Sequence, residues 1–156
     1  MQYNEKLKDL FKMKNVDAVA QCIAQDAHMG AGVAVMFDKR YPGMKAELQS
    51  QKLQYPTVVV YDKHETRPPV INLVTKPSSF RPPTYEAFMQ TMEQFHDVVI
   101  ANGYKSIAMP MIGAGLDRLN WKKQVLPAIQ NLFSDTDVEI TICFIDQNAQ
   151  YMMKKV

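Results

Sequence analysis

The sequence is poor in cysteine and glycine, has no long apolar run, and carries charges that nearly cancel. Among 156 residues there are two cysteines and six glycines, and the formal net charge is +2. A charge this small does not by itself indicate nucleic acid binding, and it does not exclude it. No apolar run has the length of a membrane span, and residues 1–6 lack the apolar stretch of a signal peptide. We therefore expect a cytoplasmic protein with no membrane partner.

Several signatures of phosphate and metal binding are also absent. The glycine and lysine spacing of a nucleoside-triphosphate P-loop does not occur, and neither does the three-glycine dinucleotide fingerprint. The three histidines show no ligand spacing with the cysteines, so we expect no metal site and no cofactor. Cys22 and Cys143 lie in apolar runs, which predicts buried thiols in a reducing compartment. No repeat or linker divides the chain, so we expect one domain over residues 1–156.

Two short loops contain four of the six glycines. They are residues 29–32 and 112–115, and each follows an apolar run. Glycine lets backbone N–H groups approach a ligand closely, and the start of a helix adds unpaired donors and a partial positive charge. Two such loops at equivalent places in an α/β pattern predict a diphosphate site. Simple tight turns in a compact domain are the alternative.

Strand patterns and helix patterns alternate along the chain. We expect strands at residues 3–10, 16–23, 57–61, 70–75, 105–109 and 138–145, and helices at 32–39, 44–53, 84–102 and 121–133. Residues 76–83 contain three prolines and are not expected to form a regular element. The alternation predicts a three-layer α/β/α sandwich, in which ligands bind beyond the carboxyl ends of the strands. Both glycine loops and the segment from Lys76 are expected at such ends.

Three charged side chains suit chemistry or base recognition. Lys76 leaves an apolar strand, and a partly desolvated lysine can act as an amine nucleophile or hold a phosphate. Asp117 follows the second loop and can act as a general base or as a partner of Lys76. Asp9 can accept the exocyclic amine of a nucleobase. A solvated lysine, a capping or turn aspartate, and an exposed carboxylate are the respective alternatives.

These motifs resemble those of the macro domain family. Residues 22–34 resemble its first ligand loop, and residues 109–119 resemble its second, phosphate-holding loop. Residues 9–11, 74–76, 83–86 and 115–119 match the branch that contains the terminal ADP-ribose protein glycohydrolases and the bacterial antitoxins that remove ADP-ribose from DNA. The likeness runs through nearly the whole chain in order, and it implies a mixed central sheet within the α/β/α sandwich.

The resemblance implies a hydrolase that removes ADP-ribose from acidic side chains of proteins or from nucleobases. It implies that Lys76 attacks the anomeric carbon to form a covalent adduct, and that Asp117 assists its resolution. Its implied partners are ADP-ribose and ADP-ribosylated protein or nucleic acid, for a monomeric enzyme. The binding residues that it implies are Asp9, Leu10, Ala24, Gly30, Ala31, Gly32, Met111, Ile112, Gly113, Ala114, Gly115, Leu116 and Ile145.

Two departures from the family pattern affect the expected mechanism. Ala24 stands where the similar proteins carry a hydroxyl residue, so one contact to a ribose or phosphate is lost. Gln25 and Asp26 stand where other macro domain branches use an asparagine, which favours the lysine–aspartate mechanism. A phosphatase acting on ADP-ribose 1″-phosphate and a non-catalytic reader of ADP-ribose are the alternatives. Binding alone requires neither Lys76 nor Asp117, which argues against the reader.

Overall fold

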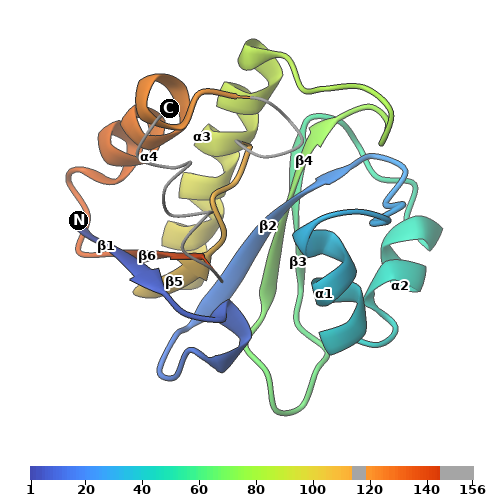
Figure 1. Ribbon diagram of the computed structural model, residues 1–156, viewed down its shortest axis with the longest axis horizontal. Helices are drawn as coiled ribbons and strands as arrows, with labels where there is room; N and C mark the ends of the chain where they lie inside the picture. The colour runs from blue at the N-terminus through green and yellow to red at the C-terminus, as the bar shows by residue number, and fades with distance from the viewer. Residues whose placement is uncertain (114–118, 145–156) are drawn as a thin grey trace.

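A six-stranded sheet forms the centre of the protein, whose computed structural model describes residues 1–113 and 119–144 (Figure 1). The strands are β1 (Gln2–Leu7), β2 (Ala18–Ala24), β3 (Thr57–Tyr61), β4 (Val70–Lys76), β5 (Ser106–Met109) and β6 (Glu139–Phe144). Their order across the sheet is β1-β6-β5-β2-β4-β3. β3 pairs antiparallel with β4 at one edge, and the other neighbouring strands pair in parallel. The mixed sheet is confirmed.

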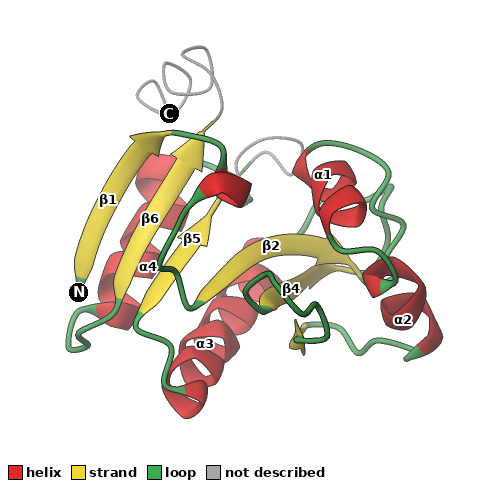
Figure 2. Cartoon of the chain, turned by 90° about the horizontal axis from the view of Figure 1, so that it is seen from below, coloured by secondary structure: helices red, strands yellow, loops and turns green. Residues whose placement is uncertain are grey.

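Helices cover both faces of this sheet, which confirms the three-layer sandwich (Figure 2). They are α1 (Val33–Arg40), α2 (Met44–Ser50), α3 (Tyr85–Asn102) and α4 (Leu126–Phe133), with short turns η1 (Leu10–Lys12) and η2 (Trp121–Val125). Successive strand residues point to opposite faces. Ala18 and Ala20 of β2 therefore pack with α3 and α4, whereas Val19 and Ile23 pack with α1 and α2. Within the described residues, no helix is long and apolar enough to cross a membrane.

Helix α3 forms as its local sequence predicts. The Thr84 hydroxyl accepts a hydrogen bond from the Ala87 backbone N–H at 3.1 Å, which caps the first turn. Phe88 and Phe95 are fully buried on the face that covers the sheet. Gly103 ends the helix with a φ of +69°, a left-handed conformation that suits glycine. This long helix forms one wall of the core beneath the second glycine loop.

Most expected boundaries agree with the structure to within one or two residues, and three elements differ in more informative ways. The first strand ends at Leu7 rather than residue 10, because Asp9 caps the η1 turn by accepting a hydrogen bond from Phe11 N at 3.0 Å. Helix α2 stops at Ser50, three residues earlier than expected. Near Pro127, the π-helical turn η2 precedes α4, and the proline stands in the first turn of α4, where its missing N–H costs little.

Candidate functional site

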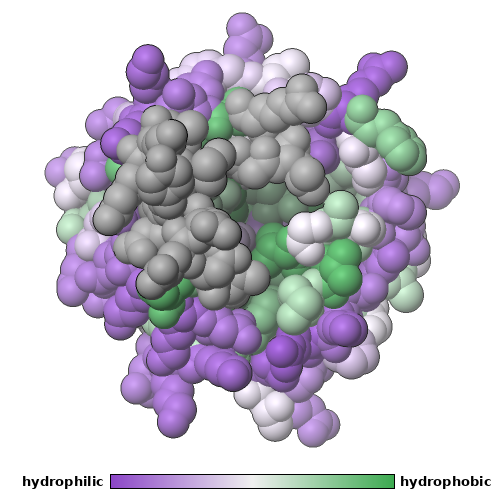
Figure 3. Space-filling view, viewed as in Figure 1, coloured by the Kyte–Doolittle hydropathy of each residue, from purple (hydrophilic) through white to green (hydrophobic). Residues whose placement is uncertain are grey.

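A cleft of about 880 Å³ opens beyond the carboxyl ends of β2, β4 and β5. In the sheet, β2 lies between β4 and β5. The chain passes from β2 to β4 on one side and later returns through α3 to β5 on the other side. Ligands of open α/β sheets bind where the strand order reverses in this way. Figure 3 shows hydrophobic residues gathered near the middle of this face. The described lining comprises Cys22, Ile23, Ala24, residues 28–34, Lys76, residues 79–82 and residues 110–113.

Lys76 reaches the cleft through a β-bulge. The register between β2 and β4 passes from Ile23 opposite Val74 to Ala24 opposite Lys76, so Thr75 is an extra residue. A bulge re-aims the side chains that follow it. Thr75 is buried, and among the described residues its hydroxyl has no hydrogen-bond partner. The half-buried Lys76 lines the cleft, and its carbonyl accepts a hydrogen bond from Gln25 N at 2.9 Å.

The first glycine loop and the start of α1 form the second wall. Gly30, Ala31 and Gly32 line the cleft, and Gly32 is the N-cap of α1. The first N–H groups of a helix lack intrahelical partners and carry a partial positive charge. Met29 has a φ of +52°, which is uncommon for a residue with a side chain and typical of ligand-binding loops. This wall is suited to an anionic group.

The second glycine loop forms the third wall, where Met111, Ile112 and Gly113 line the cleft. Gly113 has a φ of +73°, and its carbonyl accepts a hydrogen bond from Leu119 N at 2.8 Å. A Cβ on Gly113 would lie 3.0 Å from Phe88 Cε2, so glycine lets the loop pack closely on α3. The other expected residues of this part of the site lie outside the described residues: Ala114, Gly115, Leu116, Asp117 and Ile145.

Asp26 connects the first glycine loop with the segment that follows Lys76. Its carboxylate accepts hydrogen bonds from His28 N at 3.0 Å, from Ser79 N at 2.9 Å and from the Ser79 hydroxyl at 2.7 Å. Burial raises the pKa of this carboxyl, but the bonds from Ser79 and His28 outweigh that effect and hold the pKa below its usual value. In the sequence, Asp26 stands out only as a departure from the asparagine of other macro domain branches. Its connection to Ser79, 53 residues away, has no local sequence signal.

Asp9 and Leu10 follow the carboxyl end of β1, on the side of the sheet where the cleft opens. Neither is among the described residues that line the cleft. One Asp9 carboxylate oxygen serves as the cap of η1. Leu10 is buried in the same apolar cluster as Met29 and Phe37, so it belongs to the core that supports the first glycine loop. Ala24 does line the cleft, at the end of β2.

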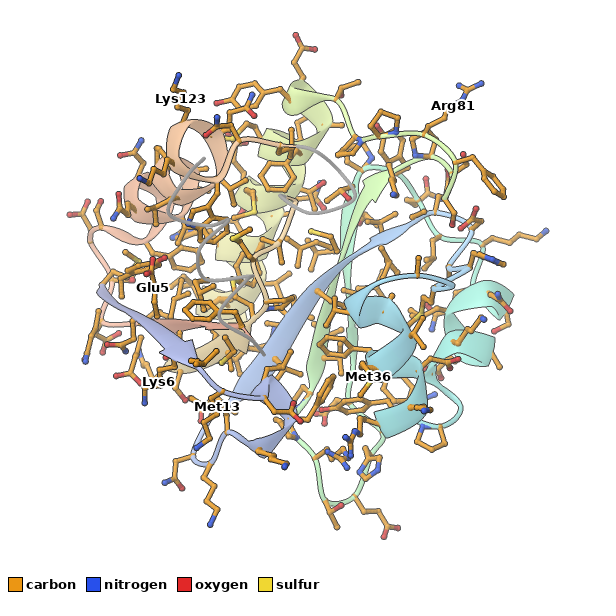
Figure 4. The ribbon with its side chains drawn as sticks, in the orientation of Figure 1. Glu5, Lys6, Met13, Met36, Arg81 and Lys123 are labelled. Carbon is orange, nitrogen blue, oxygen red and sulfur yellow. The ribbon has the colours of Figure 1, made fainter. Side chains whose placement is uncertain are left out.

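Phe80 and Arg81 also line the cleft, although neither is among the binding residues that the family resemblance implies. Phe80 is 90% exposed although it lines the cleft, which is unusual for a large aromatic side chain. Arg81 follows it and extends away from the body of the protein (Figure 4). An aromatic residue in a proline-rich loop that follows an apolar strand is the signal that could have identified them.

The two cysteines have different environments. Cys143 is buried in β6, and burial raises the pKa of its thiol to about 11, which makes it a poor nucleophile at neutral pH. Cys22 is only half-buried and lines the cleft, so the expectation of two buried thiols was wrong for Cys22. Cys22 lies near the end of β2, where the strand opens onto the cleft.

Comparison with known proteins identifies similar chains. The sequence is 37% identical over 134 residues to ADP-ribose glycohydrolase OARD1 of Homo sapiens, covering 86% of each chain, and the Bos taurus protein of that name matches equally. The fold matches the macrodomain of Thermus aquaticus DarG with a TM-score of 0.81 and 22% identity, covering 92% of this chain and 98% of that one. The macrodomain of Mycobacterium tuberculosis DarG matches with a TM-score of 0.83 and 21% identity, covering 91% of this chain and 97% of that one. No family model matches the sequence.

Proposed function

Because the chain belongs to the family of ADP-ribose glycohydrolase OARD1 and has the macro domain fold, we propose that it is a hydrolase that releases ADP-ribose from a modified macromolecule. The observation that carries this proposal is the placement of Lys76. Its side chain lines the same cleft as two glycine-containing loops and the start of α1. An amine beside backbone donors for a diphosphate is the combination that the reaction needs.

The cleft supports ADP-ribose as the ligand. Its volume of about 880 Å³ lies within the range of sites for small molecules and cofactors. We assign the diphosphate to the N–H groups at the start of α1 and in the two glycine loops. The distal ribose then lies toward Lys76, and we assign the adenine to the side of Asp9 and Leu10, at the end of β1.

The proposed reaction uses Lys76 as the nucleophile. In its unprotonated form the Lys76 amine attacks the anomeric carbon of the distal ribose, a C–N bond forms, and the bond to the modified group breaks. The leaving group departs with the electron pair, and the lysine nitrogen remains an ammonium in the adduct, so that it can later leave as a neutral amine. Water then attacks the anomeric carbon, the lysine leaves as the amine, and ADP-ribose is released. The proton from this water goes to a general base, a role that the family resemblance gives to Asp117.

Parallel assays with three substrates test the function. The protein is incubated with a glutamate-ADP-ribosylated protein, ADP-ribosylated DNA and ADP-ribose 1″-phosphate, and released ADP-ribose and phosphate are measured. We expect release from at least one of the two macromolecules. Phosphate release alone would indicate a phosphatase, and binding without any release would indicate a reader. The cytoplasmic location expected from the sequence stays a prediction.

Substitution of Lys76 tests the mechanism. We expect Lys76→Ala to abolish hydrolysis while isothermal calorimetry still detects ADP-ribose binding, because the backbone donors remain. Lys105→Ala is the matched control, because Lys105 forms an exposed ion pair with Asp137 at the far end of β5. The control should keep the activity of the unmodified protein. Hydrolysis by Lys76→Ala at the unmodified rate would contradict the lysine mechanism and favour direct attack by water.

A further inference from the structure

Two consecutive residues hold the segment that begins with Lys76. The backbone N–H of Gln25 bonds the Lys76 carbonyl at 2.9 Å, and the Asp26 carboxylate accepts two bonds from Ser79, at 2.7 and 2.9 Å. We propose that Asp26 is a positioning residue for catalysis: it fixes residues 77–82 against the first glycine loop and so orients Lys76 in the cleft. The inference rests on the proposed hydrolase function.

Among the described residues, little else holds residues 77–82 in place. Phe80, Arg81 and Pro82 are exposed, so packing contributes little to their position. The bonds from Arg81 N to the Ser78 carbonyl and from Phe80 N to the Ser78 hydroxyl stay within the segment. In the described part of the chain, the hydrogen bonds from residues 77–82 to other elements are the two that Ser79 donates to Asp26.

The chemistry of the contact makes it a firm connection. Hydrogen bonds to a carboxylate are shorter and about twice as strong as bonds between neutral groups. The third bond, from His28 N, holds the same carboxylate in the turn that leads into the first glycine loop. Asp26 itself is not among the described residues that line the cleft, whereas His28 and Ser79 both are. Asp26 therefore acts through its neighbours rather than on a ligand.

Attachment at two points explains why the contact matters for Lys76. The Gln25 bond holds the main chain at Lys76, where β4 ends, but it does not hold the residues that follow. With Asp26 as well, both ends of residues 76–79 are held. A displacement of about 1 Å of a catalytic group can cost about a hundredfold in rate. Loss of the Asp26 contact should therefore affect turnover more than binding.

Matched variants separate this role from a general structural one. Asp26→Asn keeps an oxygen for the His28 N–H but places an amide N–H₂ where the Ser79 N–H needs an acceptor. Ser79→Ala removes the hydroxyl bond, and Ser79→Thr restores a hydroxyl. Ser78→Ala is the control, because the Ser78 hydroxyl bonds only within the segment among the described residues. All variants are assayed on the substrate that the unmodified protein turns over.

We expect kcat to fall about tenfold or more in Asp26→Asn and by a smaller factor in Ser79→Ala, with KM and the ADP-ribose Kd changed by less than about threefold. Ser78→Ala should stay within about twofold of the unmodified protein, and Ser79→Thr should recover most of the kcat that Ser79→Ala loses. The double variant should be slower than Asp26→Asn alone, because Asp26→Asn keeps the oxygen that accepts the Ser79 hydroxyl and Ser79→Ala removes that remaining bond. Equal kcat in Asp26→Asn and Ser78→Ala would overturn the proposal.

A second measurement does not depend on activity. Chymotrypsin can cut after the exposed Phe80 only when this segment leaves its position, so faster cutting reports a broken contact. We expect faster cutting in Asp26→Asn than in Ser78→Ala when the two are compared under conditions that give them the same free energy of unfolding. Faster cutting with unchanged kcat would show a purely structural role and overturn the proposal. Faster cutting in a protein that releases no ADP-ribose from any substrate would instead locate the failure in the proposed function.

Discussion

Gly113 provides a direct test of why glycine stands in the second loop. With a φ of +73°, its missing Cβ would lie 3.0 Å from Phe88 Cε2 and 3.1 Å from Leu119 Cδ1. Gly103, which ends α3, has a similar φ of +69°, but beyond its own stretch of chain no atom of the described residues lies within 4 Å of the Cβ position. Comparing alanine at the two positions therefore separates backbone strain from crowding against the core.

The two costs can be assigned separately. An alanine forced into the left-handed region costs about 1–2 kcal/mol, and this is the whole cost expected for Gly103→Ala. Overpacking a well-packed core adds about 1–3 kcal/mol, which brings Gly113→Ala to about 2–5 kcal/mol. Phe88 is fully buried and cannot move away freely. In a domain of this size, 1 kcal/mol lowers Tm by about 2–4 °C, so we expect Tm to fall by about 2–8 °C and 4–20 °C respectively.

Urea unfolding followed by the fluorescence of Trp121, the single buried tryptophan, measures both free energies of unfolding. Calorimetry provides the Tm values. In Gly113→Ala, the Cβ of residue 113 would face Phe88 rather than open space. The loss in free energy of ADP-ribose binding to the folded protein should therefore be smaller than the loss in free energy of unfolding. The reasoning is refuted if Gly113→Ala costs no more than Gly103→Ala.

Three further predictions concern the edges of the cleft. Asp9→Asn should keep the cap on Phe11 yet weaken ADP-ribose binding by about 1–3 kcal/mol, because an amide nitrogen cannot accept the adenine amine; unchanged affinity in calorimetry would limit Asp9 to the turn. The lowered pKa of Asp26 means that the unfolded chain binds its proton more readily, so the Asp26 contribution to stability is present above about pH 4 and is lost as pH falls further. The free energy of unfolding of Asp26→Asn should therefore fall less steeply with pH below about pH 4 than that of the unmodified protein. The same pH dependence in both proteins would contradict a lowered pKa for Asp26. Phe80→Ala should change the free energy of unfolding by less than about 0.5 kcal/mol, because Phe80 is 90% exposed, but lower kcat/KM for the modified macromolecule; equal kcat/KM values would show that the attached group does not contact Phe80.

Local sequence determined most elements of the fold. Thr84, the apolar spacing from Phe88 to Val99 and Gly103 together predict α3, and the structure has that helix with those caps. Cap bonds and helical spacing involve residues within about four positions of one another, so they can be recognised without the rest of the chain. The same holds for the glycine loops, which the sequence places after strands and the structure places at one cleft.

The tertiary structure alone decided how the site is held. The bulge at Thr75 depends on the register between β2 and β4, two strands about fifty residues apart in the chain, and nothing near residue 75 signals it. The contact from Asp26 to Ser79 likewise joins distant loops that local rules treat as separate and solvated. Lys76 could be proposed from its position at a strand end. Its orientation results from pairing between strands and from a carboxylate on another loop, because long-range contacts form only when the sheet assembles.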